Sequence, residues 1–131
     1  MLASNNKFTK EERLSLENQI QHLFGTGTSF FMFPFKVLYI HQFEPTSFNK
    51  LLISVPKKKF AKSVLRNRIK RLIREAYRNH KSLLAEKHII GINFALIYVH
   101  SEVIEYSEME KRVILVLQEL TKRITSITTN Q

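Results

Sequence analysis

The sequence contains no cysteine, no aspartate and no tryptophan. Without cysteine, neither a disulfide framework nor a cysteine-ligated zinc site can form, and nothing requires an oxidising compartment. Without aspartate, a nuclease site in which clustered carboxylates hold two metal ions is poorly supported. The glutamates from Glu102 to Glu110 lie where a helix is predicted to start, and helix capping accounts for them. We therefore expect no catalytic residue and no metal ligand in the protein itself.

Long uninterrupted apolar runs are also lacking. Residues 1–10 have no apolar core of a secretory signal, and Pro34, Lys36 and Asn93 interrupt the apolar stretches before any could span a bilayer. A chain of 131 residues that is 44% hydrophobic suits one compact domain with one core. We expect a single cytoplasmic domain over residues 1–131, with residues 1–6 and 128–131 as candidate disordered tails.

Positive charge is concentrated in one segment. The formal net charge is +10, and the segment from Lys57 to Lys81 holds eleven basic residues against one acid, Glu75. The rest of the chain holds ten basic and ten acidic residues, so it is formally neutral. The sequence thus describes a neutral scaffold carrying one basic element, as expected for a protein with a polyanionic partner.

The first half of the chain predicts one helix followed by strands. A capping-box pattern at Thr9–Glu12 precedes apolar residues at helical spacing over residues 16–24, and glycines then stop the pattern. Residues 35–41 and 51–55 are rich in β-branched and aromatic residues and predict two strands, with turn residues between them. Side chains should alternate between the two faces of each strand.

The second half predicts helix, strand and helix. Ser63 could cap a helix running to about residue 84, and residues 92–99 suit a well-buried strand. A second capping-box pattern, Ser107 to Glu110, opens a last helix. The expected fold is α+β, with helices packed against one mixed sheet of about four strands, in the order α-β-β-(β)-α-β-α.

The helix over residues 63–84 carries the strongest functional signal. Its long basic side chains at Arg66, Lys70, Arg74 and Arg78 repeat every four residues, opposite an apolar stripe. Solvated helix faces usually alternate charges, and like charges at this spacing cost a few tenths of a kcal/mol per pair. This self-repulsion favours a polyanion-binding face over a plain solvated face.

Other patterns have simpler explanations. The five histidines show no paired metal-site spacing, and Gly25-Thr26-Gly27 lacks the third glycine of a dinucleotide motif. Phe30, Phe31 and Phe33 are more typical of core or strand packing than of a stacking platform. For Tyr39 the two interpretations are evenly balanced.

Two stretches form a long and specific pattern: Ser54-Val55-Pro56-Lys57-Lys58-Lys59-Phe60, and the run from Val64 to Glu75, which contains Arg-Asn-Arg followed by Ile-Lys-Arg. At these stretches the sequence resembles the ribonuclease P protein family. A weaker resemblance extends over nearly the whole chain. It implies a ribonucleoprotein endonuclease that removes the 5′ leader of precursor tRNA, with hydrolysis performed by an RNA subunit and its bound Mg²⁺.

The resemblance also implies residue roles. The surface that contacts the catalytic RNA maps to Arg66, Asn67, Arg68, Lys70, Arg71 and Arg74. The cleft for the precursor leader, between the first helix and the sheet, maps to Ile20, Phe24, Phe35, Val37, Tyr39 and Lys57. Ile20 stands where many members have a second aromatic residue. The family fold contains a left-handed βαβ crossover, whereas the general rule favours a right-handed one.

The expected partners are therefore ribonuclease P RNA and precursor tRNA, and neither DNA nor a membrane. One alternative is a general structured-RNA or ribosome-assembly module, which would share the basic helix but need no leader cleft. A membrane-surface protein is a second alternative. Against it, the apolar stripe of the basic helix is aliphatic, lacks tryptophan and is needed for the core.

Overall fold

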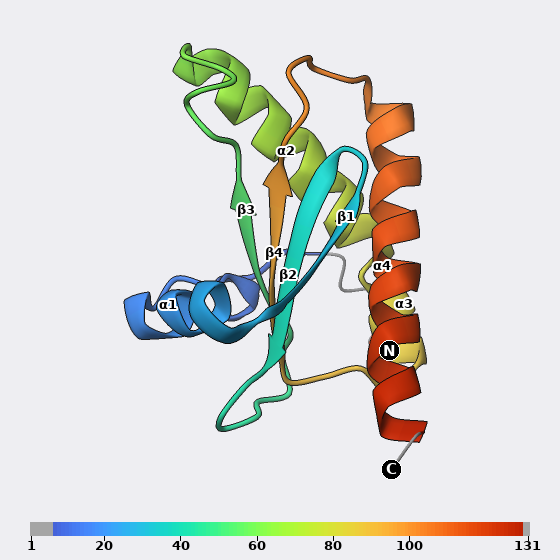
Figure 1. Cartoon of the computed structure of the whole chain (residues 1–131). Helices are drawn as coiled ribbons and strands as arrows, with labels where there is room; N and C mark the ends of the chain where they lie inside the picture. Colours follow the sequence, from blue (N-terminus) through green and yellow to red (C-terminus); the bar gives the residue numbers. More distant parts are fainter. Residues whose placement is uncertain (1–6, 130–131) are drawn as a thin grey trace.

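The computed structural model describes residues 7–129 (Figure 1). The expected tail at residues 1–6 lies outside the described residues, as do residues 130–131, whereas residues 128–129 end the last helix. The elements, in chain order, are α1 (Glu17–Thr26), β1 (Thr28–Met32), β2 (Phe35–His41), β3 (Lys50–Ser54), α2 (Ser63–His80), α3 (Ser82–Glu86), β4 (Ile92–Tyr98) and α4 (Tyr106–Thr129).

The four strands form one mixed sheet in the order β1-β2-β4-β3. β2 pairs antiparallel with both β1 and β4, while β3 pairs parallel with β4. The predicted α+β class and strand number are confirmed. β2 has its predicted bounds, β3 is shifted by one residue toward the N-terminus, and β4 ends one residue earlier than predicted. The sequence did not locate β1.

The parallel pair is joined by a left-handed crossover. With β3 and β4 pointing upward in Figure 1, α2 lies behind the sheet and β4 lies to the right of β3. This is the uncommon hand for a βαβ connection, and it is the one that the family resemblance implied. The crossover places α2 across the same face of the sheet that α4 covers.

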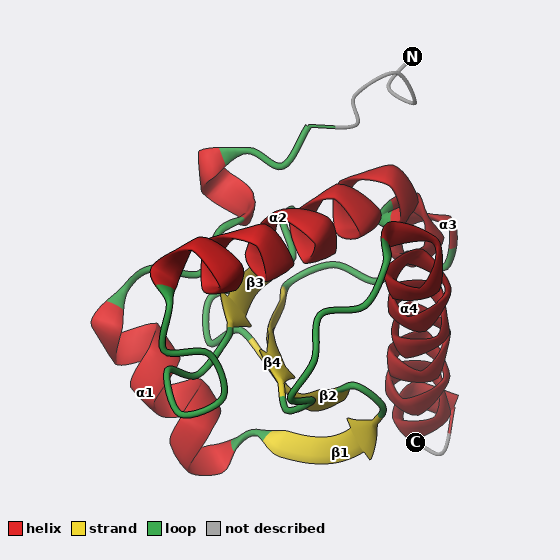
Figure 2. Cartoon of the chain, turned by 90° about the horizontal axis from the view of Figure 1, so that it is seen from above, coloured by secondary structure: helices red, strands yellow, loops and turns green. Residues whose placement is uncertain are grey.

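The two faces of the sheet bury different helices. Alternate β2 side chains, Phe35, Val37 and Tyr39, join the main core with α2 and α4. Leu38 and its neighbours on the other face pack against Leu23 of α1 in a second, smaller cluster. Figure 2 shows α1 and α4 on opposite sides of the sheet. Because successive side chains of β2 point to opposite faces of the sheet, one set packs against α2 and α4 and the other set packs against α1.

The predicted start of the first helix is wrong. Thr9 and Glu12 do form a reciprocal contact, with the Thr9 backbone N–H donating to Glu12 Oε1 at 2.8 Å. This contact closes only a short 3-10 turn at Lys10–Glu12. The chain then runs beside the edge strand β3, where the Leu14 N–H donates to the Leu51 carbonyl, before α1 begins at Glu17. A capping-box pattern fixes one turn, and tertiary pairing decides the path of the next residues.

The helix predicted over residues 63–84 is divided in two at Lys81. Lys81 Nζ lies 2.7 Å from Glu12 Oε2, and the two side chains are only 17% and 11% exposed. Lys81 Nζ also donates to the backbone carbonyl of Lys7. Lys81, the last cation of the basic segment, therefore holds the N-terminal segment onto the end of α2.

The last helix begins at Tyr106, so Ser107 lies inside the helix and does not cap it as predicted. Glu110, the other predicted capping residue, instead has its Oε2 2.7 Å from His80 Nε2. The apolar stripe of this helix is buried in the main core, at Val113, Val116, Leu117, Leu120 and Ile124.

The aromatic stretch of β1 is divided between core and surface. Phe30 packs against the main core under the guanidinium of Arg123, which lies 4.3 Å from the ring centroid. Phe33 is covered by Arg112 at 5.0 Å, whereas Phe31 is 65% exposed. Cation–π contacts with α4 therefore cover two of the three rings.

The Glu12–Lys81 pair should make a measurable contribution to stability. We expect Lys81→Met to lower the free energy of unfolding by about 2 to 3 kcal/mol, because it leaves a largely buried carboxylate unpaired. Urea unfolding monitored by circular dichroism measures the change. Lys111→Met, at an exposed lysine of α4, is the matched control and should change it by less than about 0.5 kcal/mol. Equal effects of the two substitutions would remove the pair as a stabilising contact.

Candidate RNA interface

Helix α2 presents opposite chemistry on its two sides. Its apolar side is buried through Ile69, Ile73, Ala76 and Tyr77. The other side carries basic and polar residues, of which Asn67, Arg68 and Arg71 are exposed and Arg66, Lys70 and Arg74 are half-buried. The structure thus brings all six predicted RNA-subunit contacts onto one helix.

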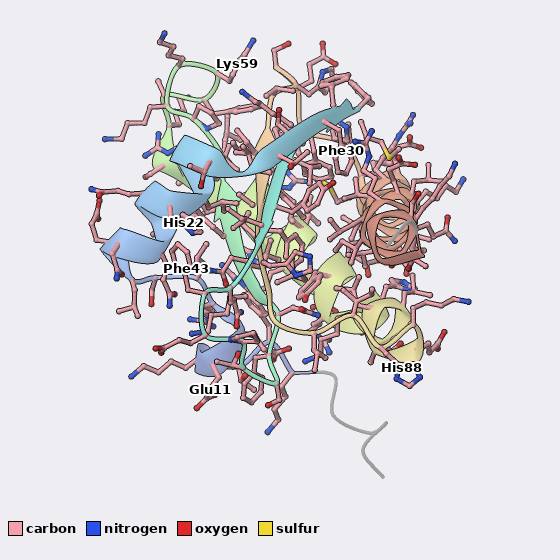
Figure 3. All side chains as sticks on the ribbon, turned by 60° about the horizontal axis from the view of Figure 1, so that its bottom comes forward. Glu11, His22, Phe30, Phe43, Lys59 and His88 are labelled. Carbon is pink, nitrogen blue, oxygen red and sulfur yellow. The ribbon has the colours of Figure 1, made fainter. Side chains whose placement is uncertain are left out.

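A lysine-rich loop extends this surface beyond the start of α2. Lys57, Lys58 and Lys59 form an exposed turn, which Figure 3 shows at the edge of the molecule. The loop is anchored by Phe60, which is 5% exposed and lies 6.1 Å from the ring of Tyr98, centroid to centroid. The buried ring of Phe60 therefore holds the loop in place, while the three lysine side chains remain exposed to solvent.

The start of α2 lacks the groups that usually satisfy a helix N-terminus. The prediction that Ser63 caps the helix is wrong, since Lys62 occupies the N-cap without a side-chain hydrogen bond and the first turn holds no acid. Backbone N–H groups and the helix dipole make such an end positive. Adding lysines and arginines there is unfavourable unless an anion is bound.

Arg66 has a structural contact as well as a position on the basic face. Its Nη1 donates to the carbonyls of Phe60 and Ala61, each at 2.8 Å. Arg66 therefore fixes the lysine-rich loop against the helix.

The remaining cations of the face differ in their pairing. Arg78 forms a two-pronged ion pair with Glu75, which holds the pKa of Glu75 below its usual range. None of the five ion pairs found among residues 7–129 involves Arg68, Lys70, Arg71 or Arg74. The net positive charge of the segment thus lies on side chains without a carboxylate partner within the described part of the chain.

A hollow of about 420 Å³ borders this face. Phe8 packs edge-on against Tyr77, with ring centroids 5.7 Å apart, and lines the hollow together with Arg71, Arg74 and Arg78. Sequence reasoning missed Phe8 because a single aromatic residue before the first helix carries no periodic signal. Burial raises the pKa of Tyr77 well above its usual range, so its hydroxyl stays neutral.

The structure does not bring together the side chains predicted to form the leader cleft. Phe35, Val37 and Tyr39 are 0%, 0% and 5% exposed and face the helices α2 and α4. A cleft between α1 and the sheet would be lined by the opposite face, which carries Leu38. Three of the six predicted residues thus belong to the core in this structure.

The other three leader candidates lie closer to solvent. Ile20 is half-buried in the small cluster under α1, Phe24 is 48% exposed, and Lys57 is exposed in the loop before α2. Only Phe24 and Lys57 present a large accessible side chain.

Two properties of the described residues concern metal binding and membrane insertion. No group of three or more histidine, cysteine, aspartate or glutamate side chains among these residues could hold a metal ion. None of the described helices is long and apolar enough to cross a membrane.

These features define a class of protein. A compact α+β scaffold presents a helix and a loop whose cations Arg68, Lys70, Arg71 and Arg74 have no ion-pair partner among residues 7–129, and this arrangement suits the phosphates of a nucleic acid. The fold and surface are those of a protein that binds a polyanion.

The family can be assigned from comparisons with known proteins. The family model described as Ribonuclease P matches residues 8–122. The ribonuclease P protein component of Porphyromonas gingivalis is 36% identical over 107 residues, covering 79% of this chain and 78% of the relative. The chain belongs to the bacterial ribonuclease P protein component family.

Solved structures agree with this assignment. A ribonuclease P protein from Staphylococcus aureus is similar with a TM-score of 0.69 and 28% identity, covering 83% of this chain and 94% of the other. The protein from Thermotoga maritima shares the fold at 24% identity, with a TM-score of 0.68, 82% of this chain and 96% of the other covered. The chain is thus a subunit of the ribonuclease P endoribonuclease, which functions in 5′ maturation of tRNA. Membership of this family implies that the chain associates with ribonuclease P RNA.

Arg68 and Arg71 provide a test of the interface. We expect Arg68→Ala and Arg71→Ala each to weaken binding to ribonuclease P RNA and to reduce the slope of log affinity against log salt concentration by about 1, because each loses a phosphate contact. Filter binding over a range of salt concentrations measures both quantities. Lys111→Ala on α4 is the control and should leave the slope unchanged; an unchanged slope in the two arginine variants would exclude their phosphate role.

Proposed function

We propose that the face of α2 and the lysine-rich loop form the contact with the RNA subunit. The observation that carries this proposal is that Arg68, Lys70, Arg71 and Arg74 have no ion-pair partner among the residues that the structure describes. Arg66 orients the loop from inside the same surface. Asn67 adds an exposed amide between the arginines, suited to a ribose or phosphate oxygen.

The chemical step belongs to the RNA subunit in this proposal. With no aspartate in the sequence, the protein offers no clustered carboxylates for a pair of catalytic metal ions. Mg²⁺ bound mainly by the RNA subunit would activate a water molecule as the nucleophile and stabilise the leaving oxygen. The role of the protein is then to neutralise phosphates of the RNA subunit and of precursor tRNA, which must approach one another. We place this reaction in the cytoplasm.

Phe24 and Lys57 are the proposed leader contacts. Both are accessible, and an aromatic ring can stack on a base of a single strand without reading its identity. Ile20 supports α1 from the small cluster below it. Phe35, Val37 and Tyr39 would contribute indirectly, by fixing the sheet on which α1 rests.

Cleavage of precursor tRNA at low magnesium concentration tests this function. The reactions contain the protein alone, a bacterial ribonuclease P RNA alone, or both. We expect efficient cleavage only in the mixture, because the protein lowers the repulsion between the two RNAs. Cleavage by the protein alone would contradict the division of labour, and binding without stimulation would favour a general RNA-binding module.

Phe24→Ala tests the leader contact. We expect the reconstituted enzyme to lose about 1 to 3 kcal/mol of affinity for precursor tRNA while keeping its affinity for mature tRNA, since only the precursor carries a base to stack on the ring. Equilibrium binding of the two substrates measures the difference. Phe31→Ala, which removes an exposed ring on β1, is the matched control. Equal losses for both substrates would remove Phe24 from the leader site.

A further inference from the structure

A second pocket lies away from the basic face, between α1 and the loop that joins β2 to β3. Its volume is about 500 Å³, within the range of small-ligand sites. The residues of α1 that line it include Gln19 and His22, whereas Phe24 is not among them. At 100° per residue, Phe24 falls on a different side of the helix from His22. The pocket is thus separate from the proposed leader contact.

An exposed aromatic ring lies at this pocket. Phe43 is 83% exposed and stacks on the imidazole of His22, with ring centroids 4.1 Å apart and planes 22° from parallel. Figure 3 shows the two residues side by side, one from α1 and one from the loop. Because the ring is held on one face by His22 and buries little surface, its other face is available for a planar ligand.

The floor of the pocket is fixed by a buried polar network. Gln42 and Asn93 are 8% and 2% exposed, and Gln42 Nε2 donates to Asn93 Oδ1 at 3.0 Å. Thr46 donates to Gln42 Oε1 through its backbone N–H at 2.8 Å and its hydroxyl at 3.0 Å. These bonds hold the loop that carries Phe43 against the sheet, so the ring does not have to be ordered when a ligand binds.

One polar atom in the pocket wall lacks the partner that its burial requires. Gln19 Oε1 is buried and has no hydrogen-bond partner among the described residues. A buried acceptor without a donor is unfavourable, and such groups are rare outside functional sites and water sites. Gln19 also lines the pocket, so a rotation of its amide would bring a hydrogen-bonding group to a ligand there.

The charge of the pocket excludes a phosphate as its main ligand. No lysine or arginine lines it, and the rim carries Glu44. A flat aromatic surface beside amide groups and a carboxylate instead suits a neutral planar ring with N–H donors at its edge. These are the properties of a nucleobase.

We propose that this pocket binds one unstacked nucleobase of single-stranded RNA. The base stacks on Phe43, and the amide of Gln19, turned toward the pocket, hydrogen-bonds to the edge of the base. The inference deepens the function proposed above and rests on the chain acting on RNA. The base could come from the RNA subunit or from precursor tRNA, and titrations with each RNA separate these sources.

The absence of tryptophan from the sequence allows a specific reporter. Phe43→Trp places the only indole of the protein at the pocket, and stacking of a base should quench its fluorescence. The full-length variant is titrated with a single-stranded RNA hexamer and with a hexamer of abasic ribose phosphates. We expect quenching by the first alone, because both carry the same phosphates and only one carries bases. Quenching by both, or by neither, would overturn the proposal.

Two further variants test the residues. Adding Gln19→Leu to the reporter should raise the hexamer concentration at half-quenching by about tenfold, by removing one hydrogen bond to a base. It should leave the thermal midpoint of the free protein unchanged or higher, since the substitution removes an unsatisfied acceptor. Phe31→Trp, at an exposed position on β1, is the control and should show no quenching. An unchanged half-quenching concentration with Gln19→Leu, or equal quenching of the two reporters, would overturn the site.

The same reporter identifies the source of the base. Quenching by ribonuclease P RNA alone assigns the base to the RNA subunit, whereas quenching only after precursor tRNA is added to the complex assigns it to the substrate. Either result supports the site, and no quenching in the complex overturns it. Cleavage is measured in parallel with the unsubstituted protein, so that failure of the proposed function is seen independently of failure of this pocket.

Discussion

The packing of the apolar side of α2 onto the sheet and α4 is the contact on which the RNA-binding surface depends. The helix carries many like charges, and by itself it would be weakened by their repulsion. Ile69, Ile73 and Ala76 are fully buried in the main core, so tertiary contacts hold the helix in place. The helix therefore stays formed although Arg68, Lys70, Arg71 and Arg74 have no ion-pair partner among residues 7–129.

Cations elsewhere in the molecule are used by the fold itself. Arg123 and Arg112 lie over aromatic rings of the β1 region and also pair with glutamates of α4. Lys81 holds the N-terminal segment through Glu12. Arg68, Lys70, Arg71 and Arg74 differ from these three cations, because no ion pair among residues 7–129 involves them.

The sheet separates two surfaces of different chemistry. α2 and its basic face lie on one side, and α1 with the polar pocket lies on the other. Phosphates are attracted to the first surface by charge, whereas the second offers stacking and hydrogen bonding with little positive charge. An RNA partner that wraps around the edge of the sheet could contact both. The binding free energies of the two surfaces would then add, because the two contacts use different side chains.

The sequence by itself determined the charge distribution, the apolar stripes of α2 and α4, the alternation along β2 and the family resemblance. These are local patterns, and they depend on residues a few positions apart. Only the tertiary structure decided where α1 begins, where the long helix breaks and which face of the sheet receives Tyr39. The contacts responsible join distant residues: Lys81 and Glu12 are 69 positions apart, and Gln42 and Asn93 are 51 apart. No local pattern encodes such pairs, because they form only when the sheet brings the segments together.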